Sequence, residues 1–180
     1  IRCNAPINSL SGLEQFFNLT SLSIDRMRPY GTYSTYRASD RLFPVNTVDT
    51  LEPLAGLVKL RELNILDSSI VDLTPLSKLP ALEWLDVSVR QGHPHQIATL
   101  EGLPETITSL NLSNHALTSI ADLQSLSSLQ SLYLNGNALT TLDGLPANNY
   151  QALDISRNPL ENFDALYSVG LRIAFFITSV

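Results

Sequence analysis

The leucines of this chain recur at a spacing that no single helix or strand can satisfy. In LQSLYLNGNALTTL, residues 129–142, successive leucines are separated by 3, 2, 5 and 3 residues. A helix repeats every 3.6 residues and a strand every 2, so neither period fits all four gaps. The pattern returns in register, and the distances from Leu63 to Leu85, from Leu110 to Leu132 and from Leu132 to Leu153 are 22, 22 and 21 residues. The sequence therefore predicts a stack of repeated units.

Each repeat divides into two halves with different spacing. The pair Leu132 and Leu134 places two side chains on one face of a short strand. The half before the strand steps by three, which suits a tight 3₁₀ turn; one such series is Leu51, Leu54, Leu57, Leu60 and Leu63. Stacked copies pair their strands into a parallel sheet at about 4.8 Å per repeat and share one core. We expect one domain, 1–180, of about seven repeats that are partial at both ends.

The repeats LQSLYLNGNAL and QALDISRNPL match the pattern LxxLxLxxNxL. The chain therefore resembles the leucine-rich repeat family, and its 22-residue spacing is similar to the class that includes the bacterial internalins. The resemblance implies an α/β right-handed solenoid, with short parallel strands on the concave face and 3₁₀ turns or extended segments on the convex face. It also implies that Asn137 and Asn158 are ladder asparagines, whose side chains bond the backbone of the turn after the strand. Elsewhere this position holds Met27, Ser68, Arg90 and His115, so those turns must satisfy their backbone groups differently.

Two insertions interrupt the period, at 28–47 and at 88–96. Both leave the solenoid just after a strand, so we expect them to project from one edge, and insertions of repeat proteins gather on the binding side. The longer insertion contains Tyr30, Tyr33 and Tyr36, which we predict to contact a partner. The alternative is that this insertion folds onto the concave face and covers Trp84.

The outward strand positions are polar except for Ala152 and two aromatic residues, Trp84 and Tyr133. They lie two repeats apart, about 10 Å along the sheet. Aromatic residues in polar surroundings are typical of a binding hot spot. The alternative is that large side chains simply cover their neighbours. The predicted partner-binding residues on the sheet are Trp84, Tyr133, Asp86, Asp154, Glu83 and Asn111.

Composition and motifs exclude several classes of function. With 11 basic and 17 acidic residues the net charge is −6, which disfavours nucleic acid and anionic membranes as partners. The signature motifs of serine hydrolases, P-loop nucleotide-binding proteins and zinc proteases are absent from the sequence. His93, His95 and His115 offer a zinc site, but an exposed loop and a ladder position explain them equally simply. Cys3 is expected to be a buried hydrophobe. We predict no enzyme activity, no metal and no cofactor.

The function expected from this pattern is a non-enzymatic module that binds a protein or peptide on its concave face, in a secreted or cell-surface bacterial protein. Two alternatives remain open, an intracellular scaffold subunit in the cytoplasm and a carbohydrate receptor that uses Trp84 and Tyr133 as stacking platforms. No apolar run is long enough to span a bilayer, so membrane association would need sequence outside this chain. The apolar end LRIAFFITSV has no polar cap, which predicts that flanking sequence, a partner or self-association covers it.

Overall fold

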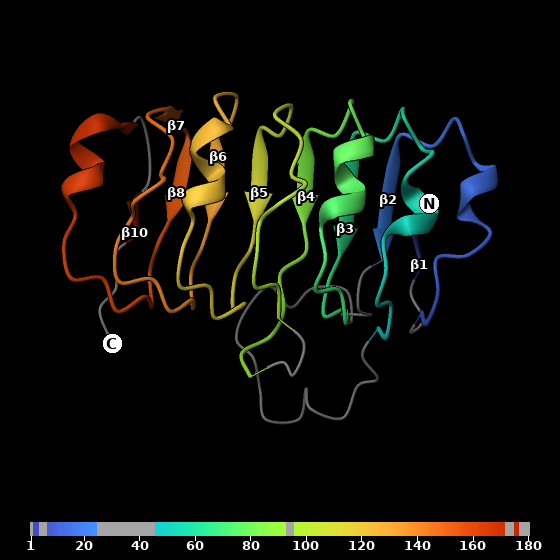
Figure 1. Cartoon of the computed structure of the whole chain (residues 1–180), viewed down its shortest axis with the longest axis horizontal. Helices are drawn as coiled ribbons and strands as arrows, with labels where there is room; N and C mark the ends of the chain where they lie inside the picture. The colour runs from blue at the N-terminus through green and yellow to red at the C-terminus, as the bar shows by residue number, and fades with distance from the viewer. Residues whose placement is uncertain (1, 4–6, 25–45, 93–95, 172–174, 177–180) are drawn as a thin grey trace, which may run out of the picture.

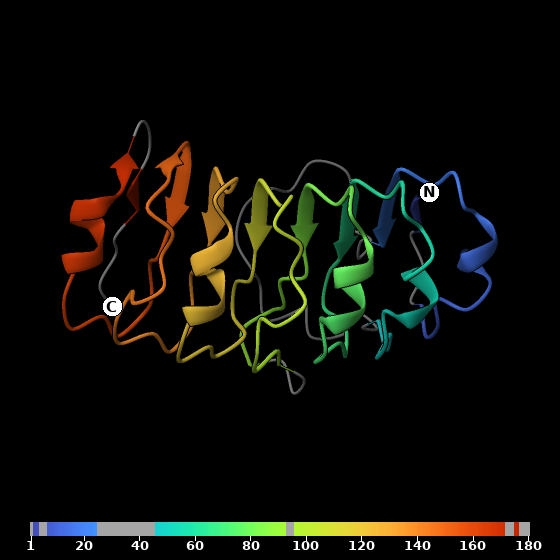
Figure 2. The ribbon, with the colours of Figure 1, turned by 45° about the horizontal axis from the view of Figure 1, so that its top comes forward.

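The computed structural model describes residues 2–3, 7–24, 46–92, 96–171 and 175–176. In this part of the chain the strands stand in one row, and short 3₁₀ helices lie on one side of that row (Figures 1 and 2). The leucine core fills the space between the two layers. The repeat solenoid expected from the leucine spacing is therefore confirmed.

One parallel sheet of eight strands runs along the molecule in chain order. Its strands are β1 (Arg2–Cys3), β2 (Ser21–Ile24), β3 (Glu62–Ile65), β4 (Trp84–Asp86), β5 (Ser109–Asn111), β6 (Ser131–Tyr133), β8 (Ala152–Asp154) and β10 (Phe175–Phe176). A second parallel pair joins β7 (Asn149–Tyr150) to β9 (Gly170–Leu171). The spacing of leucines gave no sign of this second pair.

The register of the large sheet follows the leucine pattern. Strands β2 to β6 and β8 each contribute one leucine to a single column, which consists of Leu22, Leu63, Leu85, Leu110, Leu132 and Leu153. Every side chain in this column is buried, and those of Leu63, Leu85, Leu110 and Leu132 have no exposed area. Because a strand alternates its faces, the residues between these leucines point outward.

The steps of three residues form 3₁₀ turns, as predicted. Hydrogen bonds from Leu54 N–H to Leu51 O and from Leu57 N–H to Leu54 O, 2.9 and 2.8 Å long, bring each third side chain onto the same face. The 3₁₀ helices are η1 (Leu13–Gln15), η3 (Glu52–Leu54), η4 (Thr74–Lys78), η5 (Ala121–Ser125) and η6 (Asp164–Ser168).

The two repeats that contain Gly-Leu-Pro, at 102–104 and 144–146, have turns and irregular backbone in place of the 3₁₀ helix. Their glycines, Gly102 and Gly144, adopt positive φ angles of 94° and 93°. Each lies against the start of the preceding 3₁₀ helix, where a Cβ atom would collide with Thr74 or Ala121 backbone. Glycine is therefore required for the helix-free repeats to pack closely against their neighbours.

The ladder asparagines bond the backbone as the resemblance implied. Asn137 Nδ2 donates to Leu112 O and Leu134 O at 2.9 and 2.8 Å, and its Oδ1 accepts from His115 N–H and Leu117 N–H at 3.0 Å. Asn158 does the same in the next repeat, with 2.9 and 3.0 Å bonds to Leu134 O and Ile155 O.

Three turns use other side chains. His115 accepts from Ile97 N–H through Nδ1 at 3.2 Å and bonds Val87 O through Nε2 at 2.9 Å. The N–H of Arg90 donates to Asp67 Oδ1 at 2.7 Å. Asn46, just after the long insertion, accepts from Ile7 N–H and donates to Leu66 O at 3.1 and 2.9 Å. Met27, which the repeat spacing assigns to the ladder, lies outside the described residues.

Among the helical segments of the described residues, none has the length and apolar content needed to cross a bilayer.

Candidate functional site

The outward strand positions form a surface of three rows, which we call the sheet face. The row just before the strands contains Thr20, Arg61, Glu83, Thr108, Gln130 and Gln151. The first strand row contains Ser21, Glu62, Trp84, Ser109, Ser131 and Ala152, and the second contains Ser23, Asn64, Asp86, Asn111, Tyr133 and Asp154. The side chains of the two strand rows alternate with the buried column, so the leucine core does not depend on their identity.

Trp84 and Tyr133 both lie on the sheet face and both are half-buried. Trp84 is on β4 and Tyr133 on β6, with β5 between them. The register pairs Trp84 with Ser109 and Ser109 with Ser131, so small hydroxyl side chains lie beside the indole. The predicted separation of two strands, about 10 Å, follows from this order.

A groove of about 390 Å³ lies over the first part of the sheet face. It is lined by Ser21, Leu22, Ser23, Glu62, Asn64, Glu83, Trp84 and Thr108. Of the predicted site residues that the structure describes, Trp84 and Glu83 line it. Glu62 and Asn64 were not among the predicted residues, although the repeat alignment places them in the same outward rows and would have found them.

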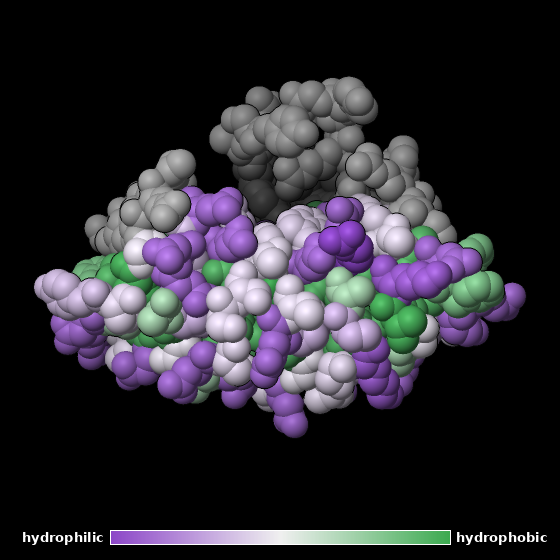
Figure 3. Space-filling model, turned by 90° about the horizontal axis from the view of Figure 1, so that it is seen from above, coloured by the Kyte–Doolittle hydropathy of each residue, from purple (hydrophilic) through white to green (hydrophobic). Residues whose placement is uncertain are grey.

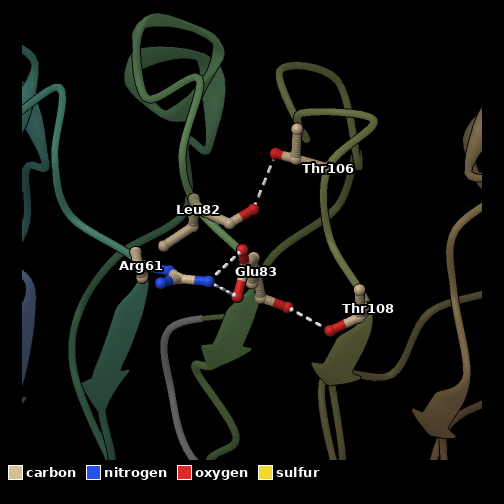
Figure 4. A network of polar contacts seen from close by, with 5 residues as sticks. All are labelled: Arg61, Leu82, Glu83, Thr106 and Thr108. Atoms are coloured by element: carbon tan, nitrogen blue, oxygen red, sulfur yellow. Dashed lines mark hydrogen bonds and ion pairs between the residues drawn. The ribbon is translucent and has the colours of Figure 1, made fainter.

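Glu83 already has a cationic partner. Arg61 Nη2 donates to its two carboxylate oxygens at 2.7 and 2.9 Å (Figure 4). The hydrogen bond and the charge of Glu83 raise the pKa of Arg61 above its ordinary value. Thr108 Oγ1 donates to the backbone oxygen of Glu83 at 3.1 Å, which connects this pair to the next strand. The pair joins β3 to β4 at the edge of the groove.

Asp86, Asn111 and Asp154 hold the turns at the ends of their strands. In each case Oδ1 accepts from the N–H and the hydroxyl of the serine two residues later: 3.0 and 2.7 Å for Asp86, 3.1 and 2.6 Å for Asn111, 3.0 and 2.7 Å for Asp154. Such side-chain turns are typical of Asp and Asn. All three remain half-buried on the sheet face, so they have a structural role beside the predicted contact with a partner.

The other predicted groups lie elsewhere or outside the described residues. Tyr30, Tyr33, Tyr36, His93 and His95 fall in the segments that the structure does not describe. His115 is buried, and its two ring nitrogens bond the backbone. Within the described ranges, no three His, Cys, Asp or Glu side chains gather in a way that suits a metal ion. Cys3 pairs in register with Ile24 of β2.

The edge where the strands begin is polar. Figure 1 draws the strand arrows pointing down, and Figure 3 views the molecule from above. Hydrophilic and intermediate residues cover most of this edge, with small apolar areas between them (Figure 3). The row from Thr20 to Gln151 belongs to this edge and contributes hydroxyl, amide and charged groups.

Comparison with known proteins identifies the fold. No protein-family model and no curated protein sequence matches the chain. The crystal structure of internalin C2 from Listeria monocytogenes aligns with 97% of this chain and 77% of its own, at 18% sequence identity and a TM-score of 0.58. An internalin, InlF, from the same species aligns with 73% of this chain and 52% of its own, at 21% identity and a TM-score of 0.38, so the likeness in fold rests on internalin C2. The chain therefore has the leucine-rich repeat fold and is internalin-like in its architecture.

Proposed function

We propose that this chain is a non-enzymatic recognition module that binds a protein or peptide partner on its sheet face, the concave side of the solenoid. The observation that carries the proposal is Trp84. It is the only tryptophan of the chain, it occupies an outward strand position, and it lines a groove. Tryptophan and tyrosine are enriched at interfaces because they combine a large apolar surface with a polar group.

Tyr133 extends the proposed surface to β6, and Asp154 extends it to β8. The polar residues around the aromatics suit the rim of an interface, where hydrogen bonds and water contribute more than apolar area does. Tyr30, Tyr33 and Tyr36 belong to the same proposal on the strength of the sequence. We further propose that the module acts in a secreted or cell-surface protein of a bacterium, and the fold likeness to a Listeria internalin supports this.

The experiment compares capture of proteins by the immobilised chain and by its aromatic variants. We expect Trp84→Ala and Tyr133→Ala each to weaken binding of a captured partner by about 1 to 3 kcal/mol. Tyr167→Ala is the matched control, because Tyr167 is 92% exposed on η6 and lies away from the sheet face. It should bind like the parent.

A partner that binds the Trp84→Ala, Tyr133→Ala double variant as tightly as the parent would contradict the proposal. A glycan array with the same variants tests the carbohydrate alternative. Glycan binding that depends on both Trp84 and Tyr133 would show that the ligand of the sheet face is a carbohydrate and not a protein.

A further inference from the structure

The groove on the sheet face presents hydrogen-bond acceptors beside an aromatic ring. Its lining contains the carboxylates of Glu62 and Glu83, the amide of Asn64 and the indole of Trp84, and no lysine, arginine or histidine is among the described residues that line it. Glu83 is bound to Arg61 at 2.7 Å. Glu62 is therefore the carboxylate of the groove that forms no salt bridge among the described residues.

Glu62 lies directly beside Trp84. The two occupy paired positions on β3 and β4, so their side chains leave the sheet about 4.8 Å apart. The Glu62 side chain is exposed, and its Oε2 accepts one hydrogen bond, from Ser21 Oγ at 2.9 Å. The carboxylate thus keeps capacity for a further donor next to the ring.

Asn64 adds a third acceptor two residues further along β3, on the same face. Its Oδ1 atom is buried and has no hydrogen-bond partner among the described residues. An acceptor in this condition is destabilising until a donor reaches it. Asn64 is also one of the residues that line the groove.

We propose that the groove receives the guanidinium group of an arginine from the protein partner. This inference rests on the proposed function and specifies the chemistry of the partner. A guanidinium is planar, so it stacks on the face of Trp84, and its N–H groups form a fork that suits the two oxygens of Glu62. A remaining N–H points along the strand toward Asn64. A lysine ammonium offers no plane for stacking, and a neutral donor lacks the charge attraction to Glu62.

The electrostatics of the groove favour a cation. Arg61 shows this locally, because its hydrogen bond to Glu83, the charge of Glu83 and the charge of Glu62 all raise its pKa. The net charge of −6 adds a long-range attraction for basic partners.

Trp84 makes the proposal directly measurable, since it is the only tryptophan of the chain. The probe is N-acetyl-arginine amide, titrated into the full chain while the fluorescence of Trp84 and its indole N–H signal in NMR spectra are recorded. We expect a saturable change with a Kd in the millimolar range, as suits one side chain, and a weaker effect at high salt. N-acetyl-citrulline amide has nearly the same shape without the charge. It should bind at least about fivefold more weakly.

Two variants test the role of the carboxylate. Glu62→Gln keeps an acceptor for Ser21 and removes the charge, and it should raise the Kd for the arginine probe about threefold or more. Glu101→Gln changes an exposed glutamate that does not line the groove and should leave the Kd unchanged. Equal binding of the arginine and citrulline probes, or an unchanged Kd for Glu62→Gln, would overturn the inference.

These outcomes are separate from the test of the recognition module itself. Suppose that a partner no longer binds the double aromatic variant but binds Glu62→Gln as tightly as the parent. The recognition module would then be supported, and an arginine contact in the groove would be excluded. A partner whose binding is weakened by Glu62→Gln, together with a positive arginine titration, supports both.

Discussion

The imidazole of His115 lies in the core and replaces a ladder asparagine. Its Nδ1 accepts from Ile97 N–H, so Nε2 carries the proton and donates to Val87 O. We predict that His115→Ala lowers the free energy of unfolding by about 3 kcal/mol, because two buried backbone groups lose their partner and a cavity forms. Thr118→Ala, at an exposed position three residues later, is the control and should stay near the parent in urea titrations. Equal losses for the two variants would mean that the histidine bonds do not contribute.

Tyr150 is fully buried, and its hydroxyl donates to Pro146 O at 3.1 Å. Burial raises the pKa of this phenol well above its ordinary value of about 10. Because the pKa is raised in the folded state, the contribution of Tyr150 to the free energy of unfolding is complete below pH 10. This contribution is lost as the pH rises beyond 10. The free energy of unfolding should therefore fall above pH 10 in the parent, and less steeply in Tyr150→Phe. Tyr167→Phe, at an exposed site, should keep the slope of the parent. Identical slopes for all three proteins would refute this.

At the scale of elements, the helix-free repeats depend on glycine. A Cβ atom on Gly144 would lie 2.5 Å from Ala121 Cα and 2.7 Å from Ile120 O, and its φ angle is 93°. We predict that Gly144→Ala lowers the free energy of unfolding by about 2 kcal/mol or more, since both the clash and the backbone angle oppose it. Gly56→Ala meets no atom within 4 Å and should change stability by about 0.5 kcal/mol or less. The comparison needs only thermal or urea unfolding, and a Gly144 variant as stable as the Gly56 variant would contradict the packing.

At the scale of the whole molecule, one continuous sheet and one leucine cluster connect the repeats. Each repeat contacts its neighbours, so a destabilising change in one repeat should lower the stability of the other repeats as well. We predict that Leu132→Ala costs about 2 to 5 kcal/mol and lowers the unfolding midpoint seen by Trp84 fluorescence, although Trp84 lies two strands away. Circular dichroism, which reports on all repeats, should give the same midpoint. A Trp84 midpoint that stays at the parental value while the circular dichroism midpoint falls would show that the two halves unfold independently.

The period and the inward face of the solenoid could be predicted from the sequence alone. The steps of three before each strand and the pair Leu132 and Leu134 are local patterns, and local backbone geometry decides which face each side chain takes. The leucine column, the 3₁₀ turns and the roles of Asn137 and Asn158 follow from that. The outward rows follow as well, which is why Trp84 and Tyr133 could be placed on one surface before the structure was known.

The partner of each polar side chain follows from the folded array and not from the repeat pattern. Asn46 accepts a hydrogen bond from the N–H of Ile7, 39 residues away, and Arg61 forms a salt bridge with Glu83, 22 residues away. The sequence pattern does not show whether Asp86 and Asp154 contact a partner or the local backbone. The structure shows that both accept hydrogen bonds from the serines two residues later. Side chains on one face meet partners from other repeats, and which of them meet depends on the stacking distance and register between turns. That information is absent from the spacing within any single repeat, because a polar side chain has several possible partners and only the folded array selects one.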